Sequence, residues 1–156
     1  MASAAVERFL EHAERLGVPV EVREFPTGTR TAEDAAAAIG CDVAQIVKSL
    51  VFIADGRPVL ALTSGRNRVD ERRLAAAIGA SEVRKADADE VREATGYAIG
   101  GTPPFGHATD LEVVCDRDLT GFDEVWAAAG TPATVFGLAP ARLLAATAAR
   151  VVDLAA

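Results

Sequence analysis

Residues 45–63 read QIVKSLVFIADGRPVLALT, and this stretch decides the fold. Its first half, Gln45 to Ala54, is almost wholly apolar and rich in β-branched side chains, which is typical of a strand at the centre of a sheet. Asp55-Gly56 is a hairpin turn signal, so residues 57–63 are expected to return as a second strand. The sequence therefore predicts a β-hairpin whose first strand is buried.

Helices and further strands are predicted on both sides of this hairpin. Apolar residues recur at helical spacing or follow good N-cap residues, and glycines close most of these segments. The expected helices cover residues 3–16, 32–39, 71–78, 88–95 and 140–147. The expected further strands cover residues 20–25, 111–115, 125–129, 133–138 and 150–154, and a turn is expected at residues 116–118. Because hairpins are mixed with inserted helices, we predict an α+β fold (mixed α/β) with a mixed, partly closed sheet; a doubly wound parallel sheet is the alternative.

Length, composition and charge limit the number of domains and the kinds of partner that the protein can have. With 156 residues, half of them hydrophobic, the chain fits a single domain, residues 1–156. No apolar run is long enough to span a bilayer and the N-terminal segment has no signal-peptide core, so we expect a cytoplasmic protein with no membrane partner. The net charge of −7 argues against a broad surface that tracks nucleic-acid phosphates. A nucleic-acid partner is therefore expected to touch only a small area.

Cysteine and histidine are too sparse to predict a metal centre. Cys41 and Cys115 lie far apart without a CxxC spacing, and only His12 and His107 could join them as soft ligands. We expect no metal and no cofactor. The cysteines are expected to be small buried residues, with a disulfide as the alternative.

One group of cations stands out on this acidic chain. It comprises Arg66, Arg68, Arg72, Arg73, Arg84 and Lys85. The group could form a local basic rim that touches RNA, or a solvated helix face with Glu71 and Glu82 nearby. The sequence leaves both interpretations open.

A segment rich in glycine and proline, GYAIGGTPPFGH at residues 96–107, cannot continue a helix or a central strand. It predicts an irregular loop of defined shape, in which glycines let backbone amides approach a ligand and Pro103-Pro104 stiffens the chain. A rigid turn between two elements is the alternative. Because the segment lacks a preceding strand and a following helix, it does not match a dinucleotide-binding fingerprint.

Lysine is rare in this chain, with Lys48 and Lys85 against fourteen arginines. Lys48 interrupts the apolar strand, where an ammonium needs a partner or a ligand, and its compact charge fits a pocket too narrow for a guanidinium. The alternative is a lysine that points to solvent from an edge strand or snorkels. Lys85 lies in a charged segment and is predicted to be an ordinary surface residue.

His107 ends the glycine-rich loop. By spacing alone it could be a general base, an orienting donor or a structural cap on the turn. Asp110 follows at a spacing that could fix the His107 tautomer. The sequence shows no Ser-His-Asp arrangement, and it leaves the three roles of His107 open.

The strand QIVKSLVF, residues 45–52, together with the loop at residues 96–107 resembles the YbaK/ProX family of aminoacyl-tRNA deacylases. The likeness extends to AAGTP at residues 128–132 and to a closing helix followed by residues 151–153, so it covers the chain from Phe25 to Leu154. The resemblance implies a compact α/β fold around a mixed, barrel-like sheet surrounded by helices. It also implies a relation to the editing domain inserted in bacterial prolyl-tRNA synthetases.

The resemblance further implies an activity and a site. The activity is hydrolysis, in trans, of the ester between a wrong amino acid and its tRNA. The expected partners are the acceptor end of a mischarged tRNA and, in addition, an aminoacyl-tRNA synthetase. The residues implied to act in catalysis are Lys48, which falls on the family's strand lysine, and Gly100, Gly101 and Thr102, which fall on its GxxxP loop, Gly100 to Pro104. The residues implied to bind the substrate are Ile99, Pro103, Pro104, Phe105, His107, Phe25, Ala129, Gly130 and Thr131.

The expected chemistry needs neither a metal nor a covalent nucleophile. An aminoacyl ester needs an oriented water, a stabilised oxyanion and a protonated leaving oxygen. In this picture the backbone of Gly100 to Thr102 holds the carbonyl and the amine, and Lys48 anchors the terminal adenosine or its phosphate. The pocket selects a substrate by excluding bulky side chains.

The family pattern also bears on which amino acid the protein would remove from tRNA. Gly130 is followed by Thr131-Pro132 rather than by the arginine-containing segment of the cysteinyl-specific branch, so cysteinyl-tRNA specificity is not expected. Two other functions stay open. One is a module that binds aminoacyl-tRNA or a synthetase without catalysis, and the other is hydrolysis of a small-molecule ester or amide.

Overall fold

The structure, a computed structural model, describes residues 3–25 and 31–156. Its helices are α1 (Ala4–Arg15), α2 (Ala32–Ile39), α3 (Glu71–Ile78), α4 (Ala88–Thr95) and α5 (Pro140–Thr147), with 3₁₀ helices at Val43–Gln45 and Arg117–Gly121. Its strands are β1 (Arg23–Glu24), β2 (Ile46–Ala54), β3 (Arg57–Ser64), β4 (Val83–Lys85), β5 (Glu112–Asp116), β6 (Val125–Ala128), β7 (Thr134–Leu138) and β8 (Arg150–Val152).

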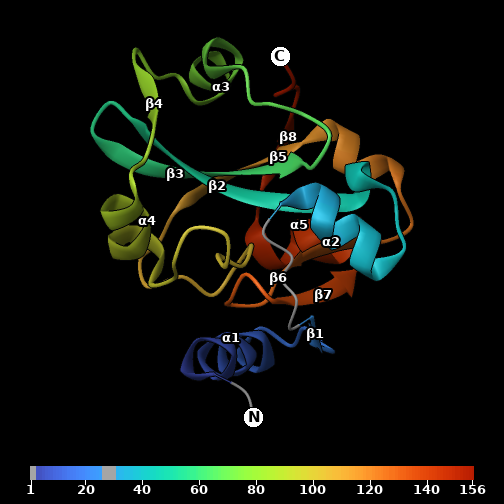
Figure 1. The fold of residues 1–156 in the computed structure, drawn as a ribbon. Coiled ribbons are helices and arrows are strands. Elements are labelled where there is room, and N and C mark those ends of the chain that lie inside the picture. The colour runs from blue at the N-terminus through green and yellow to red at the C-terminus, as the bar shows by residue number, and fades with distance from the viewer. Residues whose placement is uncertain (1–2, 26–30) are drawn as a thin grey trace.

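The eight strands of the described residues join one mixed sheet. Their order is β1-β7-β6-β2-β3-β5-β8, and β4 pairs with β2 outside this path. The pairs of β2 with β6, β3 with β5 and β5 with β8 are parallel, and the other pairs are antiparallel. In Figure 1 the sheet bends so that β6 and β7 lie below β2 and β3, with helices around it. The predicted fold class, a mixed and partly closed sheet surrounded by helices, is confirmed.

The β2–β3 hairpin is built as the sequence predicts. Lys48 lies opposite Thr63 in its register, and the turn residues Asp55 and Gly56 have φ angles of 49° and 85°. Two successive left-handed residues are typical of a type I′ turn, whose twist matches that of the flanking strands. The turn therefore fixes the register that places Lys48.

The opposite edge of β2 is paired only at its two ends. Parallel β6 pairs with Ile46 and Val47, and antiparallel β4 pairs with Phe52 to Ala54. No strand of the described residues pairs with this edge at residues 48–51. The sheet thus has an opening beside the middle of its central strand.

Apolar side chains bury β2 on both faces. Val47 and Val51 contact the large cluster that includes α1, and we call this the inner face. Phe52 contacts a second cluster that includes α3, on the outer face. Because successive side chains alternate between faces, Ser49 belongs to the inner face and Lys48 to the outer face. Burial on both faces explains why this strand reads as a continuous apolar run.

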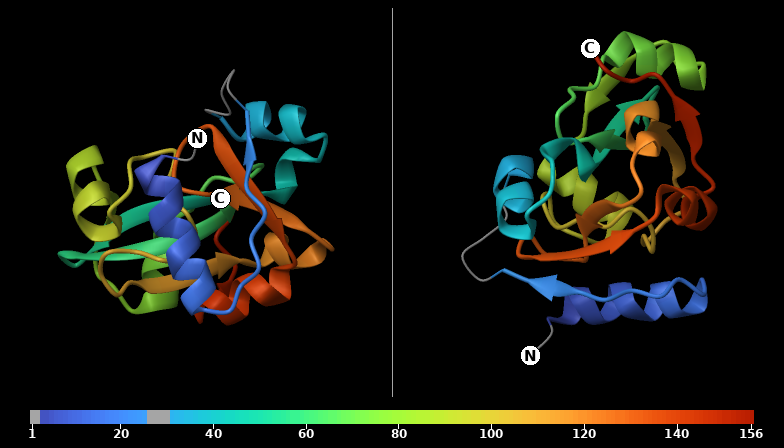
Figure 2. Two further views of the ribbon diagram at one scale, coloured as in Figure 1. Left: turned by 90° about the horizontal axis from the view of Figure 1, so that it is seen from below. Right: turned by 90° about the vertical axis from the view of Figure 1, so that its right-hand side faces the viewer.

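Three aromatic rings hold α1, the glycine-rich loop and β7 together. Phe9, Phe105 and Phe136 are buried, and their ring centroids lie 5.1, 4.9 and 5.9 Å apart in the three pairs. Burying one such ring is worth roughly 1.5–3 kcal/mol. Figure 2 shows α1 along one side of the molecule, so this contact ties a peripheral helix to the loop.

The structure corrects three local predictions. The strand expected at residues 20–25 is only Arg23–Glu24, because both side chains are exposed and the strand pairs at the end of the sheet with β7 alone. β4 was not predicted, since its Val-Arg-Lys sequence carries no strand pattern and it forms by pairing with β2. The turn expected at residues 116–118 is a 3₁₀ helix, Arg117–Gly121, which Asp116 caps. The other predicted elements agree with the structure to within two residues.

Among the described residues, no helix has the length and apolar character that crossing a membrane requires.

Two glycines give a matched test of this packing. Gly130 has φ +120°, and a Cβ there would lie 2.9 Å from the backbone carbonyl of Ala5, whereas a Cβ at Gly121 would meet nothing within 4 Å. We expect Gly130→Ala to lower the free energy of unfolding by more than about 1 kcal/mol. Gly121→Ala should change it by less than about 0.5 kcal/mol. Urea unfolding measures both values, and equal stabilities would contradict the close contact with α1.

Candidate functional site

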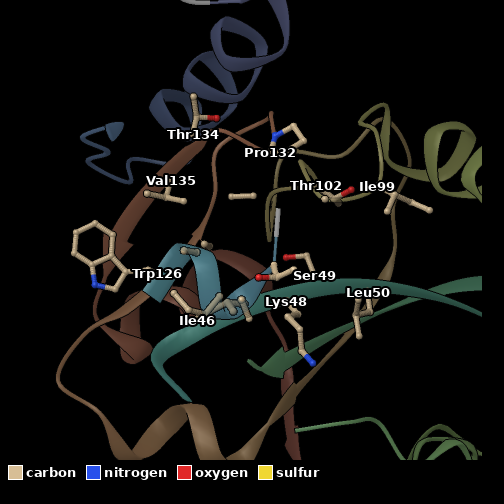
Figure 3. A pocket seen from close by; sticks show the side chains of 17 residues that line it. Ile46, Lys48, Ser49, Leu50, Ile99, Thr102, Trp126, Pro132, Thr134 and Val135 are labelled. Carbon is tan, nitrogen blue, oxygen red and sulfur yellow. The ribbon is translucent and has the colours of Figure 1, made fainter. Parts of the chain in front are cut away.

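A cavity of about 290 Å³ opens beside the middle of β2 (Figure 3). It lies between α2, the ends of β6 and β7, and the glycine-rich loop. β2 contributes residues 46–50, and the loop contributes Ile99, Gly100 and Thr102. Lys48 is the one charged residue among the described residues that line it. The structure thus brings four of the predicted site residues to one cavity.

The loop takes its shape from bonds to a single carbonyl. The Gly101 amide donates to the Ala98 carbonyl oxygen at 3.0 Å, and the Thr102 hydroxyl donates to the same oxygen at 3.1 Å. Gly100 adopts φ +85°, a conformation that favours glycine. Within the described residues, no acceptor bonds the amides of Gly100 and Thr102. Of Gly100, Gly101 and Thr102, the first and the third therefore have N–H groups that a ligand could use, whereas Gly101 is engaged within the loop.

Gly101 also allows a close approach between two backbones. A Cβ on Gly101 would lie 2.8 Å from Cα of Thr131 and 2.9 Å from the Gly130 carbonyl oxygen. In this turn between β6 and β7, the Thr131 and Thr134 hydroxyls share a hydrogen bond of 2.8 Å. The predicted residues Gly101, Gly130 and Thr131 thus meet next to the cavity and fix the loop against the turn.

Lys48 lies on the opposite side of β2 from the loop. Its ammonium donates to the Asn67 carbonyl oxygen at 2.5 Å. The Asn67 side chain in turn donates to Asp116 at 2.9 Å and to Asp118 at 2.7 Å, which holds it in place. In Figure 3 the Lys48 nitrogen points away from Thr102. The ammonium therefore lies on the outer face of the strand, away from the loop.

Lys48 is partly desolvated and carries a charge that no direct ion pair of the described residues neutralises. Burial lowers the pKa of the Lys48 ammonium, the Glu33 and Asp116 carboxylates oppose this shift, and the positive charges of Lys85 and Arg68 add to it. The part of the chain that the structure describes gives Lys48 no salt bridge. A partly desolvated cation that forms no salt bridge is a favourable place for an anionic ligand group.

Ser49 lies on the loop side of β2, as Thr102 does (Figure 3). Its hydroxyl is buried and has no hydrogen-bond partner among the described residues. The lining hydroxyls of Thr102 and Thr134 both have partners. An unpaired buried hydroxyl costs about 1–3 kcal/mol, so a ligand that bonds to Ser49 would remove this penalty.

Of the predicted substrate-binding residues only Ile99 lines this cavity, and Phe105, Ala129 and Phe25 are among those that do not. Phe105 belongs to the aromatic cluster of the core, and Ala129 is fully buried in the same cluster. Phe25 lies beside β7, because its amide donates to the Ala133 carbonyl oxygen at 2.8 Å, and its ring contacts the guanidinium of Arg23. The geometry gives these side chains structural roles.

His107 faces a different cavity, of about 340 Å³, which His12 and Pro104 also line. Its Nε2 lies 2.7 Å from the Pro103 carbonyl oxygen, and because a carbonyl only accepts, Nε2 carries the proton. Burial lowers the pKa of His107, the bond to Pro103 opposes this, and His12 adds to the lowering. Of the three roles open from sequence, this geometry supports the structural cap. Pro103 and Pro104 are buried, and together with the bond from His107 they stabilise the end of the loop.

Sequence reasoning missed the wall that α2 supplies. Ala32 and Ala35 line the cavity, opposite the loop. The alanine-rich composition of this helix is the one available signal, since small side chains let a helix approach a sheet closely. Trp126 of β6 and Val135 of β7 complete the apolar lining, but nothing in the sequence distinguishes them from core residues.

Neither cysteine is placed to act in this cavity. Both thiols are free, so the disulfide alternative does not apply. Cys115 is buried in the core, where burial raises its pKa to about 12, and burial also raises the pKa of Cys41. Thiols with raised pKa values stay protonated and are poor nucleophiles.

Comparison with known proteins identifies the class to which this site belongs. The family model of the aminoacyl-tRNA editing domain matches residues 27–146. The chain therefore belongs to the aminoacyl-tRNA editing domain family, and the resemblance stated from the sequence is confirmed.

Individual relatives agree with this assignment. YwhH, an uncharacterized protein of Bacillus subtilis, is 36% identical over 124 residues, which are 79% of this chain and 78% of YwhH. The proline–tRNA ligase of Geobacter sp. strain M21 is 38% identical over 112 residues, which are 72% of this chain but 19% of the ligase. The chain thus corresponds to about a fifth of that ligase.

Solved structures share the whole fold. A protein described as a proposed trans-editing enzyme for prolyl-tRNA synthetase is 46% identical, with a TM-score of 0.95 over 100% of this chain and 99% of that chain. The hypothetical protein APE2540 is 29% identical, with a TM-score of 0.88 over 96% of this chain and 99% of that chain.

The buried imidazole of His107 predicts a pH dependence of stability. Because its pKa in the folded protein lies below the ordinary value of 6.5, the unfolded chain binds more protons than the folded one as the pH falls through this range. We expect the free energy of unfolding to decrease from pH 7.5 to about pH 5 more steeply in the wild type than in His107→Gln, whose amide still donates to Pro103. Urea unfolding at the two pH values measures this difference. Equal slopes would show that His107 is not buried in its neutral form.

Proposed function

We propose that this protein is a trans-acting aminoacyl-tRNA deacylase that hydrolyses the ester of a mischarged tRNA in the cytoplasm. The observation that carries the proposal is the cavity of this member of the editing-domain family. In it, Lys48, which forms no salt bridge among the described residues, lies across β2 from the amides of Gly100 and Thr102. Action in trans is supported by the likeness to a protein described as a proposed trans-editing enzyme, which this chain matches over 99% of that protein's length.

The proposed chemistry assigns one task to each side of β2. When water attacks the ester carbonyl, the new carbon–oxygen bond leaves negative charge on the carbonyl oxygen, and the amides of Gly100 and Thr102 donate to it. The bond to the ribose oxygen then breaks, and that oxygen takes up the proton that the water loses. From the outer face, Lys48 anchors a phosphate or the ribose and so positions the ester over the loop. Since these groups stabilise the developing charge, we infer that the reaction needs no metal.

The lining of the cavity sets the proposed substrate class. The side chains of Ala32, Ala35 and Val135 surround a space of about 290 Å³. Packed side chains exclude a larger amino acid because it would clash with them. They discriminate only weakly against a smaller amino acid, which fits but makes fewer contacts. We therefore assign the cavity to a small amino acid on the acceptor end of the tRNA. The net charge of −7 is consistent with a contact limited to that end.

A second candidate is a module that binds an aminoacyl end or a synthetase without hydrolysis. The observation that favours it is the direction of the Lys48 ammonium, which bonds to Asn67 and points away from Thr102 (Figure 3). In this case the loop and the lysine would recognise the ligand without stabilising a transition state.

Hydrolysis of tRNAs charged with Ala, Ser, Thr, Cys or Pro tests the proposal. We expect the wild type to deacylate at least one of them, and Lys48→Ala to lower kcat/KM for that tRNA by about 10²–10³-fold. The stability of Lys48→Ala should equal or exceed that of the wild type, because the substitution removes a partly buried cation without a carboxylate. Release of the labelled amino acid gives the rates, and urea unfolding gives the stabilities.

The controls separate the loss of an anchor from the loss of any cation. Arg57→Ala removes an exposed guanidinium that pairs with Glu112 at 2.7 Å, and it should leave the rate unchanged. A chelator should also leave the rate unchanged. Full activity of Lys48→Ala would exclude Lys48 from the mechanism, and retention of tRNA without hydrolysis of any ester would favour the binding module.

A further inference from the structure

A second cavity, of about 200 Å³, adjoins the candidate site. The residues that line both cavities are Ser49, Leu50, Ile99, Gly100 and Thr102. From this shared boundary the second cavity extends along β2 to β4 and α4, where Lys85, Ala86 and Val91 line it. The two cavities are therefore neighbouring compartments on either side of one boundary.

The opening in the sheet joins these compartments. At one end of the opening, the pairing of β2 with β6 stops at Val47. At the other end, the Ala86 amide donates to the Val51 carbonyl oxygen at 3.1 Å. Successive residues of a strand direct their backbone groups to opposite edges, so Ser49 directs its N–H and C=O to the same edge as Val51. The N–H and C=O of Ser49 thus face the boundary, on the edge of β2 where no described strand pairs at residues 48–51.

Both lysines of the chain lie on the outer face beside this opening. Lys85 is directly opposite Phe52 in the β4–β2 register, and opposed residues share a face. Phe52 and Lys48 are four residues apart on β2, so they share that face as well. The charge of Lys85 is among the causes that lower the pKa of Lys48, which agrees with this placement.

Lys85 forms no salt bridge among the described residues, and in this it resembles Arg68 and Arg72 and differs from the other three cations of the predicted basic rim. The guanidinium of its neighbour Arg84 donates to both carboxylate oxygens of Glu90 at 2.8 Å. Arg66 and Arg73 also pair with carboxylates. Lys85 is exposed and forms no salt bridge among the described residues. The second cavity has no carboxylate among its described lining residues, so it favours an anion.

The shared boundary offers an exposed apolar side chain and an unpaired hydroxyl. Ile99 is 56% exposed, which is high for a large apolar residue. The Ser49 hydroxyl has no partner in the described structure. A flat heterocyclic ring can pack on Ile99, and a ribose hydroxyl can bond to Ser49. A nucleoside phosphate contains such a ring and such a hydroxyl, and its phosphate carries the negative charge that can pair with Lys85.

We propose that the second cavity is a nucleotide subsite, in which Lys85 binds a phosphate and the space beside Ile99 holds the terminal nucleoside of the tRNA. The first cavity then holds the aminoacyl group, and the ester lies at the boundary near Ser49 and Gly100. This inference rests on the proposed deacylase function. It gives Lys85, which the sequence predicts to be an ordinary surface residue, a binding role.

Titration with adenosine 5′-monophosphate tests the subsite without requiring hydrolysis. We expect the nucleotide to shift the amide resonances of Lys85, Ala86 and Ile99 in a ¹⁵N-labelled protein, and Lys85→Ala to weaken this binding at least threefold. Adenosine without a phosphate should bind the wild type and Lys85→Ala equally. Absence of shifts, or shifts confined to residues outside the second cavity, would overturn the subsite.

Kinetics on the tRNA that the wild type hydrolyses give a second readout. Lys85→Ala should raise KM about fivefold with kcat within twofold of the wild type, and Lys85→Arg should restore most of the loss. The slope of log KM against log salt should fall by about 0.7, the value for one lost phosphate contact on a single strand. Arg92→Ala, which removes an exposed cation of α4 that lines neither cavity, is the matched control.

The two readouts separate the two claims. Equal KM values and salt slopes for Lys85→Ala and Arg92→Ala would overturn the assignment of Lys85, even if the wild type is a deacylase. If nucleotide binding depends on Lys85 but no mischarged tRNA is hydrolysed, the subsite stands and the deacylase function fails.

Discussion

The site of this protein depends on the interrupted pairing of its central strand. β2 pairs along its full length with β3, but on the other edge only with β6 at Ile46 and Val47 and with β4 from Phe52. A fully paired strand would leave no backbone groups for a ligand, and a free edge would invite association with other chains. The short gap between two pairings avoids both problems, because the glycine-rich loop lies over it.

Contacts between backbones hold that loop in place. Gly101 approaches Thr131, Gly130 approaches the first turn of α1, and Phe105 anchors the end of the loop in the core. His107 adds a hydrogen bond to the Pro103 carbonyl from the far side. A rigid loop presents its free amides without reorganisation, which is the condition under which amide donors stabilise an oxyanion most strongly. Residues that do not line the first cavity thus determine the geometry of the loop.

Local patterns predicted much of this fold, and non-local contacts account for what they missed. The hairpin turn at Asp55-Gly56 and the helix caps follow from residues close in sequence, so these predictions are confirmed. β4 forms only by pairing with β2, so it has no sequence pattern of its own. The alanine-rich composition of α2 is compatible with close packing, but it does not distinguish a helix that lines the cavity from one that packs elsewhere. The family resemblance implies that Phe105 binds the substrate, whereas its ring packs in the core. The sequence does not distinguish the two positions, because an aromatic residue in a loop gives the same signal whether it lines a cavity or fills the core.

The central claim is that the opening beside Ser49 receives an aminoacyl ester, with the two lysines on the phosphate side. A crystal structure with 3′-alanylamino-3′-deoxyadenosine 5′-phosphate, in which an amide replaces the ester, tests it most directly. The account predicts the carbonyl oxygen within hydrogen-bond distance of the Gly100 and Thr102 amides, the alanyl group in the first cavity and the phosphate beside Lys85. A ligand bound at the cavity of His107, or one whose carbonyl does not contact the loop, would contradict it.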